Sequence, residues 1–133
     1  MREYKFRSYI DDDVNEPYMA YFSFEDISAG GAVVGAYDRY GEHIGAFDLH
    51  SDVISIMQYT GLKDKNGKNV YEGDIIRNSN FSFSKILPVI FSSFHAAFIG
   101  NIGDGVNQLL CRMEISNYEV IGNIHENPDL LDK

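Results

Sequence analysis

The chain has 133 residues, enough for one domain or two small subdomains, and carries a formal net charge of −9. Residues 1–60 hold four basic and eleven acidic residues, whereas residues 61–133 hold seven and nine. Without a basic stripe to neutralise phosphates, sequence-independent binding to nucleic acids or to an anionic membrane is disfavoured. The acidic surplus fits a basic partner better.

Apolar and polar residues alternate with a period of two, which predicts a mostly β chain. In the opening strand this places Tyr4, Phe6 and Ser8 on one side. The run Asp11–Asp13 predicts a solvated turn, and cation binding is the less common fate of such a run. The segment Asp52–Thr60 fits both a strand and a helical face, and we favour the strand. The other strands predicted in this half are Glu3–Ile10, Tyr18–Phe24, Ala32–Tyr37 and Glu42–Leu49.

The stretch QYTGLKDKNGKNVYEGDII, residues 58–76, invites two ligand-binding interpretations. A phosphate-binding loop fails because five residues, not four, separate Gly61 from Gly67, and Asn69 stands where a hydroxyl is needed. A calcium loop beginning at Asp64 fails because Lys68 would repel the ion from an all-oxygen site. The remaining interpretation is structural.

Asn66-Gly67 is a strong hairpin signal, because both residues tolerate the positive φ of a type I′ turn. The hairpin would project its lysines into water, and Gly73 would then permit a sharp bend before the next strand. A type I′ turn predicts three facing pairs: Lys65 with Lys68, Asp64 with Asn69, and Leu62 with Tyr71.

The second half continues as strands, predicted at Asp74–Ser79, Leu87–Phe94, Leu109–Ile115 and Tyr118–Ile124. Pro88 must then lie at a strand end or on an edge, because it cannot donate to a ladder. The run Ile86–Gly103 has no charged residue and reads equally as a buried hairpin or as an oligomer interface. Near the end, Asn127 before Pro128 and Asp129 predicts the cap of a short helical turn.

Three blocks of the sequence resemble the YopX family of small proteins from phages and prophages of low-GC Gram-positive bacteria. They are REYKFRSY at residues 2–9, MQYTGLKDKNGKNVYEGDII at 57–76 and YEVIGNIHENPDLLD at 118–132. The middle and closing blocks are the specific ones, and together the blocks imply a full-length member. The chain departs from the family pattern in having no Trp and in its acidic turn at Asp11–Asp13.

The resemblance implies a mainly β fold with a small barrel in the C-terminal half. It supplies no catalytic, cofactor-binding or metal-binding residue. It carries over only signature positions, which are Tyr59, Gly61, Asp64, Gly67, Tyr71, Gly73, Asp74, Gly122, Asn123, Glu126, Asn127 and Pro128.

Other candidate groups favour structural interpretations. His43, His50 and His95 lack the spacing of zinc ligands, and a surface pair is preferred over an acid–base pair for His50 with Asp52. No nucleophile elbow surrounds Ser92 or Ser93, and no dinucleotide-binding motif is present. The lone Cys111 predicts a reduced thiol, and the N-terminus has no apolar signal segment, so we expect a cytoplasmic protein in the bacterial host.

The sequence thus predicts one YopX-like domain, residues 1–133, mainly β with minor α. An N-terminal antiparallel sheet would cover residues 1–69, and an SH3-like small barrel ending in a short helix would cover residues 70–133. We expect no enzyme, but a phage or prophage accessory protein that binds a host or phage protein and that could form a homo-oligomer. The alternative is a nucleic-acid-associated barrel of phage gene regulation or replication, for which Lys63, Lys65, Lys68 and Arg77 form the available basic cluster.

Overall fold

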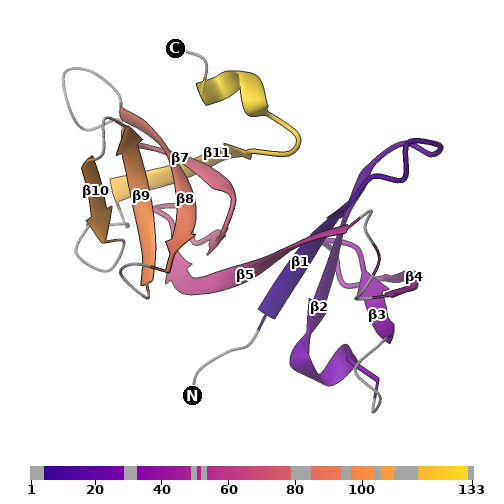
Figure 1. The fold of residues 1–133 in the computed structure, drawn as a ribbon. Helices are drawn as coiled ribbons and strands as arrows, with labels where there is room; N and C mark the ends of the chain where they lie inside the picture. The colour runs from indigo at the N-terminus through magenta and orange to yellow at the C-terminus, as the bar shows by residue number, and fades with distance from the viewer. Residues whose placement is uncertain are drawn as a thin grey trace. The chain divides into compact units, whose positions relative to one another are not determined.

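β-Strands make up most of the regular structure of the chain (Figure 1). The computed structural model describes residues 5–28, 33–48, 51, 54–78, 85–93, 97–103, 106–109 and 117–131. Within these ranges the strands are β1 (Lys5–Ile10), β2 (Tyr18–Ser23), β3 (Val33–Tyr37), β4 (His43–Asp48), β5 (Ile54–Lys63), β6 (Asn69–Tyr71), β7 (Asp74–Asn78), β8 (Lys85–Ser92), β9 (Ala97–Gly103), β10 (Val106–Leu109) and β11 (Tyr118–Asn123). Two short 3₁₀-helices join them, η1 (Phe24–Asp26) and η4 (Pro128–Leu131). The predicted mainly β fold is confirmed.

The chain divides into two units, Met1–Tyr59 and Thr60–Lys133. This division comes earlier than the predicted one between residues 69 and 70. The reason is that the hairpin formed by the end of β5 and by β6 belongs to the second unit, where Leu62 packs against a buried cluster that contains Val70 and Ile76.

In the first unit an antiparallel sheet runs in the order β4-β3-β2-β1-β5. Phe6 on β1 lies opposite Phe22 on β2, and their rings stack with centroids 5.3 Å apart. Phe22 also meets the edge of Phe47 from β4 at 5.6 Å. Ser8 is buried on the same side of β1 as Phe6, whereas Tyr4 lies outside the described residues. The alternation in the sequence therefore marks a true sheet face.

The ambiguous segment before Thr60 is extended. Residues 54–63 form β5, whose Ile54 lies opposite Ile10 and whose Gln58 lies opposite Phe6 on β1. The helical alternative is wrong, because pairing with β1 satisfies the backbone along this segment. Asp52 and Val53 lie outside the described residues.

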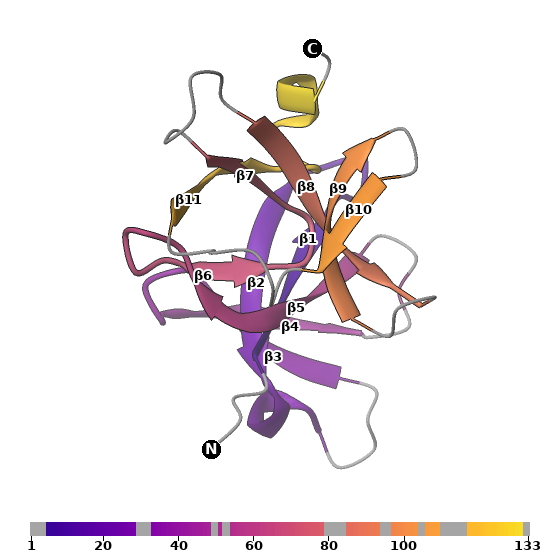
Figure 2. The ribbon, with the colours of Figure 1, turned by 90° about the vertical axis from the view of Figure 1, so that its left-hand side faces the viewer.

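In the second unit, five antiparallel strands run in the order β10-β9-β8-β7-β11, and the end of β5 pairs with β6 (Figure 2). Several of these strands contribute to a cluster of buried side chains, which comprises Val70, Ile76, Leu87, Val89 and Tyr118. This arrangement is compatible with a small barrel, and the SH3-like assignment stays a prediction.

The charge-free run Ile86–Gly103 contributes some of its side chains to the core. Leu87, Val89 and Ile99 are buried, at 3%, 0% and 1% exposure. Phe91 points outward at 47% exposure and meets the ring of Phe98 edge-on at 5.3 Å. One set of side chains thus faces the core while Phe91 is exposed, and both the fully buried hairpin and the oligomer interface stay predictions.

Pro88 occupies neither a strand end nor a sheet edge, contrary to prediction. It lies inside β8, opposite Ile75 of β7. From Val89 onward the ladder of β8 is with β9 instead. β8 therefore changes its pairing partner directly after Pro88. Proline has no N–H to donate, and it is tolerated here because the ladder to β7 ends at this position.

The predicted strand Leu109–Ile115 falls almost entirely outside the described residues, as does Cys111. Only Leu109 is described, as the last residue of β10. Within the described part of the chain, no helix has the length and apolar character needed to cross a membrane.

Candidate functional site

The hairpin of the middle block closes by a different turn from the one predicted. Asp64 N donates to Lys68 O at 2.8 Å, and Gly67 N donates to Asp64 O at 3.0 Å. Gly67 has a φ of 79°, whereas Asn66 is not among the described residues with positive φ. The loop is thus a type I turn followed by a left-handed glycine, the usual three-residue hairpin loop.

This geometry shifts the facing pairs by one residue. Asp64 rather than Lys65 lies opposite Lys68, and the Lys63 Nζ donates to Asn69 Oδ1 at 2.7 Å. The predicted lysine–lysine pair is therefore wrong. The hairpin itself, with an exposed tip, is confirmed.

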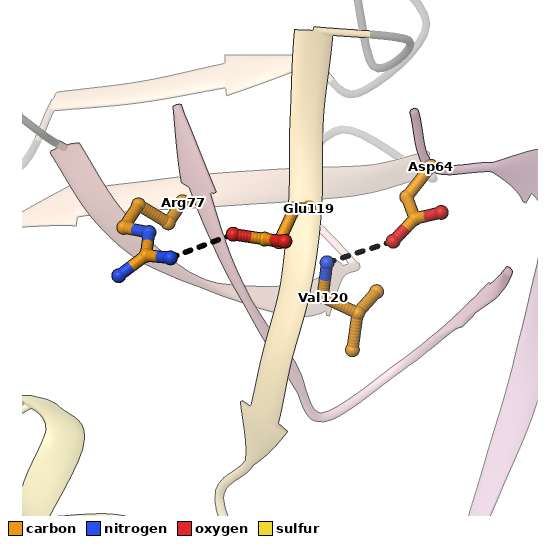
Figure 3. Close-up of polar contacts among 4 residues, drawn as sticks. All are labelled: Asp64, Arg77, Glu119 and Val120. Carbon is orange, nitrogen blue, oxygen red and sulfur yellow. Dashed lines mark hydrogen bonds and ion pairs between the residues drawn. The ribbon is translucent and has the colours of Figure 1, made fainter. Parts of the chain in front are cut away.

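The carboxylate of Asp64 explains the choice of turn. Its Oδ1 accepts hydrogen bonds from Asn66 N and Lys68 N, each at 2.9 Å, which fixes the type I geometry from within. Its Oδ2 accepts from Val120 N on β11 at 2.9 Å (Figure 3). Lys65 N donates to Tyr118 O beside it, at 2.9 Å. Asp64 is only 5% exposed, so it joins the turn to the last strand and does not simply screen the lysines.

A second buried carboxylate supports the corner between β6 and β7. Asp74 Oδ2 accepts from Tyr71 N at 2.7 Å, and Asp74 is 1% exposed. Gly73 has a φ of 87°, the left-handed region that glycine adopts without strain. Its N–H donates to Val89 O at 2.7 Å and its C=O accepts from Ile124 N at 2.9 Å. Gly73 thus links three segments of the second unit through its backbone.

The closing block is a compact hydrogen-bonded turn. Asn123 Oδ1 accepts from His125 N and Glu126 N at 3.0 and 2.9 Å, and its Nδ2 donates to Glu126 Oε1 at 2.7 Å. Gly122 is tightly packed, because a Cβ there would lie 2.6 Å from Asn127 Oδ1 and 2.9 Å from Leu130 Cδ1, and these side chains would have to shift. The side chains of this block therefore pack on one another.

The prediction that the Asn127 side chain caps the final turn is wrong. Its Oδ1 accepts from Asn123 N at 3.2 Å, behind it in the chain, and its backbone O accepts from Leu130 N at 3.1 Å. Pro128 does begin the 3₁₀-helix η4. A short 3₁₀-helix leaves little for a side-chain cap to satisfy, so the amide closes the preceding turn instead.

The remaining signature positions are also part of the framework. Tyr59 is buried, with Lys5 Nζ 5.7 Å from its ring centroid, and Gly61 has a φ of 88°. The bonds described above for Asp64, Asp74, Asn123 and Asn127 are mainly to backbone groups of their own unit.

The basic cluster of the second unit is partly neutralised from within. Arg77 forms an ion pair with Glu119 at 2.6 Å, and their side chains are 40% and 25% exposed (Figure 3). The Arg77 hydrogen bond, assisted by the charge of Lys65, holds the pKa of Glu119 below its ordinary value. Lys68 remains exposed at the hairpin tip. Of the four cations, Arg77 is therefore paired with a carboxylate, whereas the three lysines are exposed at the hairpin.

Most of the candidate acid–base and metal-binding groups lie beyond the described residues, so these interpretations stay untested for them. His50, Asp52 and His95 lie outside them. His43 is exposed and meets the ring of Tyr37 edge-on at 5.3 Å. No three His, Cys, Asp or Glu side chains of the described part are grouped as metal ligands.

The acidic turn Asp11–Asp13 is held by its own side chains. Asp12 Oδ1 accepts from Val14 N and Asn15 N at 3.0 and 2.8 Å. Two hydrogen bonds from Asn15 lower the pKa of Asp12. The bond from the Asn15 backbone N–H has the larger effect, and the bond from the Asn15 side chain comes next. The predicted solvated turn is confirmed by its exposure.

A second turn of the Asp64 kind joins β3 to β4, at the segment DRYG where the sequence indicates a turn. At Asp38–Glu42, Asp38 N donates to Glu42 O at 2.8 Å and Gly41 N donates to Asp38 O at 3.0 Å. Asp38 Oδ1 accepts from Tyr40 N and Glu42 N, each at 2.9 Å. The shared spacing D-x-x-G-x, in DRYGE and DKNGK, is a signal that could have predicted this turn type at both.

These observations define a mainly β protein of two units whose recognisable residues hold the backbone in place. The chain belongs to the YopX family, since the sequence model of that family, described as YopX protein, matches residues 5–132.

Two solved structures are similar over nearly the whole chain. Protein EF1440 from Enterococcus faecalis is 26% identical, with a TM-score of 0.54, over 96% of this chain and 97% of that one. Protein YopX from Bacillus subtilis is 20% identical, with a TM-score of 0.62, over the same shares, and supports the fold. No curated protein matches the sequence significantly.

Proposed function

We propose that this YopX-family chain is a phage- or prophage-encoded accessory protein that acts by binding another protein of the host or phage. The proposal rests on a difference between the polar signature side chains and the exposed apolar side chains. The polar signature residues, such as Asp64 and Asn123, are engaged with the backbone of their own unit. Large apolar side chains such as Val14 and Tyr40 are instead directed into solvent, at 86% and 81% exposure. Exposed aromatic side chains are typical anchors of protein interfaces.

The charge of the chain indicates the kind of partner. With −9 overall and most of the surplus before residue 61, a basic protein surface would be attracted and nucleic acid repelled. The alternative, a nucleic-acid-associated barrel, is less well supported because Arg77 is already paired with Glu119.

Affinity capture tests the proposal. Tagged chain would be expressed in a lysogenic or infected host, and co-purifying proteins would be identified by mass. We expect a stoichiometric protein whose retention falls with added salt. Recovery of nothing above an untagged control, from both kinds of cell, would contradict the proposal.

Titration with labelled oligonucleotides at low and moderate salt separates the alternative. Binding that weakens steeply with salt, and that is lost in a Lys65→Ala/Lys68→Ala variant, would favour the nucleic-acid function. Light scattering on the same samples would report whether the chain forms the homo-oligomer expected from its apolar run.

A further inference from the structure

The exposed apolar side chains gather most densely on the hairpin formed by β3 and β4. Nine large apolar side chains of the described residues are exposed. Three belong to this hairpin, namely Val33 at 47%, Tyr40 at 81% and Ile44 at 44% exposure. In the second unit, the exposed residues are spread out: Phe91 lies on β8, Leu131 on η4, and Ile124 in the turn after β11. The hairpin is therefore the described segment with the most apolar surface available for contact.

The hairpin also ends a sheet. Among the described residues, β4 pairs with β3 alone, and four successive pairs run from Val33 with Asp48 to Ala36 with Gly45. The bulge in this ladder falls at Ile44, near the tip, so the stretch Gly45–Asp48 keeps a regular register. A terminal strand presents a row of unpaired N–H and C=O groups that can accept another strand.

The terminal strand of the second unit, β11, has backbone groups on its outer edge that are already hydrogen-bonded. β11 is terminal in its sheet order, yet Asp64 Oδ2 accepts from Val120 N and Lys65 N donates to Tyr118 O. A turn of the same chain thus occupies that edge. The stretch Gly45–Phe47 of β4 differs, because within the described ranges its backbone pairs with β3 and with no other segment.

The tip beside this edge is already organised for contact. Asp38 holds the backbone of Tyr40 and Glu42, and Gly41 takes a left-handed φ of 85°. The Arg39 guanidinium carbon lies 5.1 Å from the ring centroid of Tyr40, which restrains both side chains. A surface that needs little ordering loses less free energy when it binds.

Charge indicates the chemistry of the occupant. Glu42 and Asp48, both exposed, bracket β4 at its two ends, within a unit whose formal charge is strongly negative. They lie six positions apart, which corresponds to about 20 Å of extended chain. A complementary strand would carry Lys or Arg at both ends and apolar residues between them.

We propose that the outer edge of β4, with Tyr40 at the adjoining tip, binds an extended segment of a partner protein that has an apolar centre and a basic residue at each end. This rests on the proposed function and gives it a location. The partner strand adds to β4 by main-chain hydrogen bonds, while Glu42 and Asp48 select basic ends.

A labelled synthetic peptide tests this directly. The probe alternates Val and Thr over about seven residues and ends in Lys on both sides, matching the span of the edge. Its control has Glu in place of both Lys. Fluorescence anisotropy is expected to show salt-sensitive binding of the Lys peptide at least about tenfold tighter than that of the Glu peptide. Equal affinity for the two peptides would overturn the proposal.

Variants locate the binding. Ala46→Pro removes an N–H in the regular part of β4 and is expected to weaken the Lys peptide about tenfold or more. Glu42→Gln/Asp48→Asn, which leaves the strand shape unchanged, is expected to abolish the preference for Lys over Glu. Phe91→Ser, an exposed aromatic of the second unit, is the matched control and should bind as wild type does.

Binding unchanged in both edge variants would place the site elsewhere. Light scattering could instead detect a homodimer that the Ala46→Pro variant no longer forms. That result would assign the β4 edge to a second copy of the chain and refute the proposal that a partner protein binds there. Captured host or phage protein that stays bound to the edge variants would refute this location and leave the proposed function standing. Failure of wild type to capture any protein would refute the proposed function itself.

Discussion

Two turns with the same sequence spacing serve opposite purposes in the two units. DRYGE at Asp38–Glu42 and DKNGK at Asp64–Lys68 share the same pattern of four hydrogen bonds around an aspartate and a left-handed glycine. The carboxylate of Asp64 accepts a third bond, from Val120 N of β11, and Asp64 is buried. The Asp38 turn instead carries Tyr40 out into solvent. The same type of turn thus stabilises the sheet of the second unit and exposes the Tyr40 side chain in the first unit.

The largest expected effect comes from removing the two aspartates. Asp64→Ala leaves Asn66 N, Lys68 N and Val120 N without their acceptor and is expected to lower the free energy of unfolding by about 3 kcal/mol. Asp38→Ala, at an exposed tip where water can replace the carboxylate, is expected to lose about 1 kcal/mol. Urea denaturation followed by circular dichroism measures both.

Asp64→Asn separates the turn from the tether to β11. The amide oxygen can still accept both bonds of the turn, but an NH₂ group takes the place of Oδ2 and cannot accept from Val120 N. We expect a loss of about 2 kcal/mol, against less than about 0.5 kcal/mol for Asp38→Asn. Equal losses in the two turns would show that the bond from Val120 N to Asp64 adds nothing.

Gly122→Ala tests the packing of the closing block. The added methyl group would lie 2.6 Å from Asn127 Oδ1 and must displace that side chain. Overpacking of this kind is expected to lower stability by about 2 kcal/mol. Gly35→Ala is the matched control in the first unit, because its nearest described neighbours are 3.9 Å or more away. Thermal melts of the two variants compare them.

The two turn glycines should behave alike. Gly41 and Gly67 have φ values of 85° and 79°, and a methyl group added at either would have no described neighbour within 4 Å. Replacing either by Ala is expected to cost about 1 kcal/mol, from backbone strain alone. A much larger loss at Gly67 in denaturation curves would place the difference between the turns in their backbone, contrary to the carboxylate argument.

The smallest expected effect is the pH dependence that the Arg77–Glu119 pair of the second unit contributes to stability. The hydrogen bond from Arg77 lowers the folded-state pKa of Glu119, so the pair stabilises the fold above the ordinary carboxyl pKa. This contribution is lost as pH falls through the lowered folded-state value. The stability difference between wild type and Glu119→Gln should therefore be largest at neutral pH and vanish in acid. A difference that grows in acid would contradict this sign.

The sequence predicted the strands because alternation is a local property, visible in segments such as Lys5–Ile10 and Tyr18–Ser23. It predicted the Asn66-Gly67 hairpin but not its turn type. The preference of Asn-Gly for a type I′ turn takes no account of Asp64, two positions earlier, whose carboxylate accepts from N–H groups of the turn. The bond from Val120 N to Asp64 joins residues 56 positions apart, which no local pattern reveals. The same holds for Pro88, whose place depends on where β8 changes partner.

Gly73 has a bearing on how the chain is assembled. Its amide bonds to Val89 and its carbonyl to the amide of Ile124, so the corner is complete only when a segment about fifty residues downstream has been made. During synthesis, residues 5–58 can form their sheet while the later half still waits for its last strand. We therefore expect the first unit to be able to fold during synthesis before the second unit, which stays incomplete until β11 has been made.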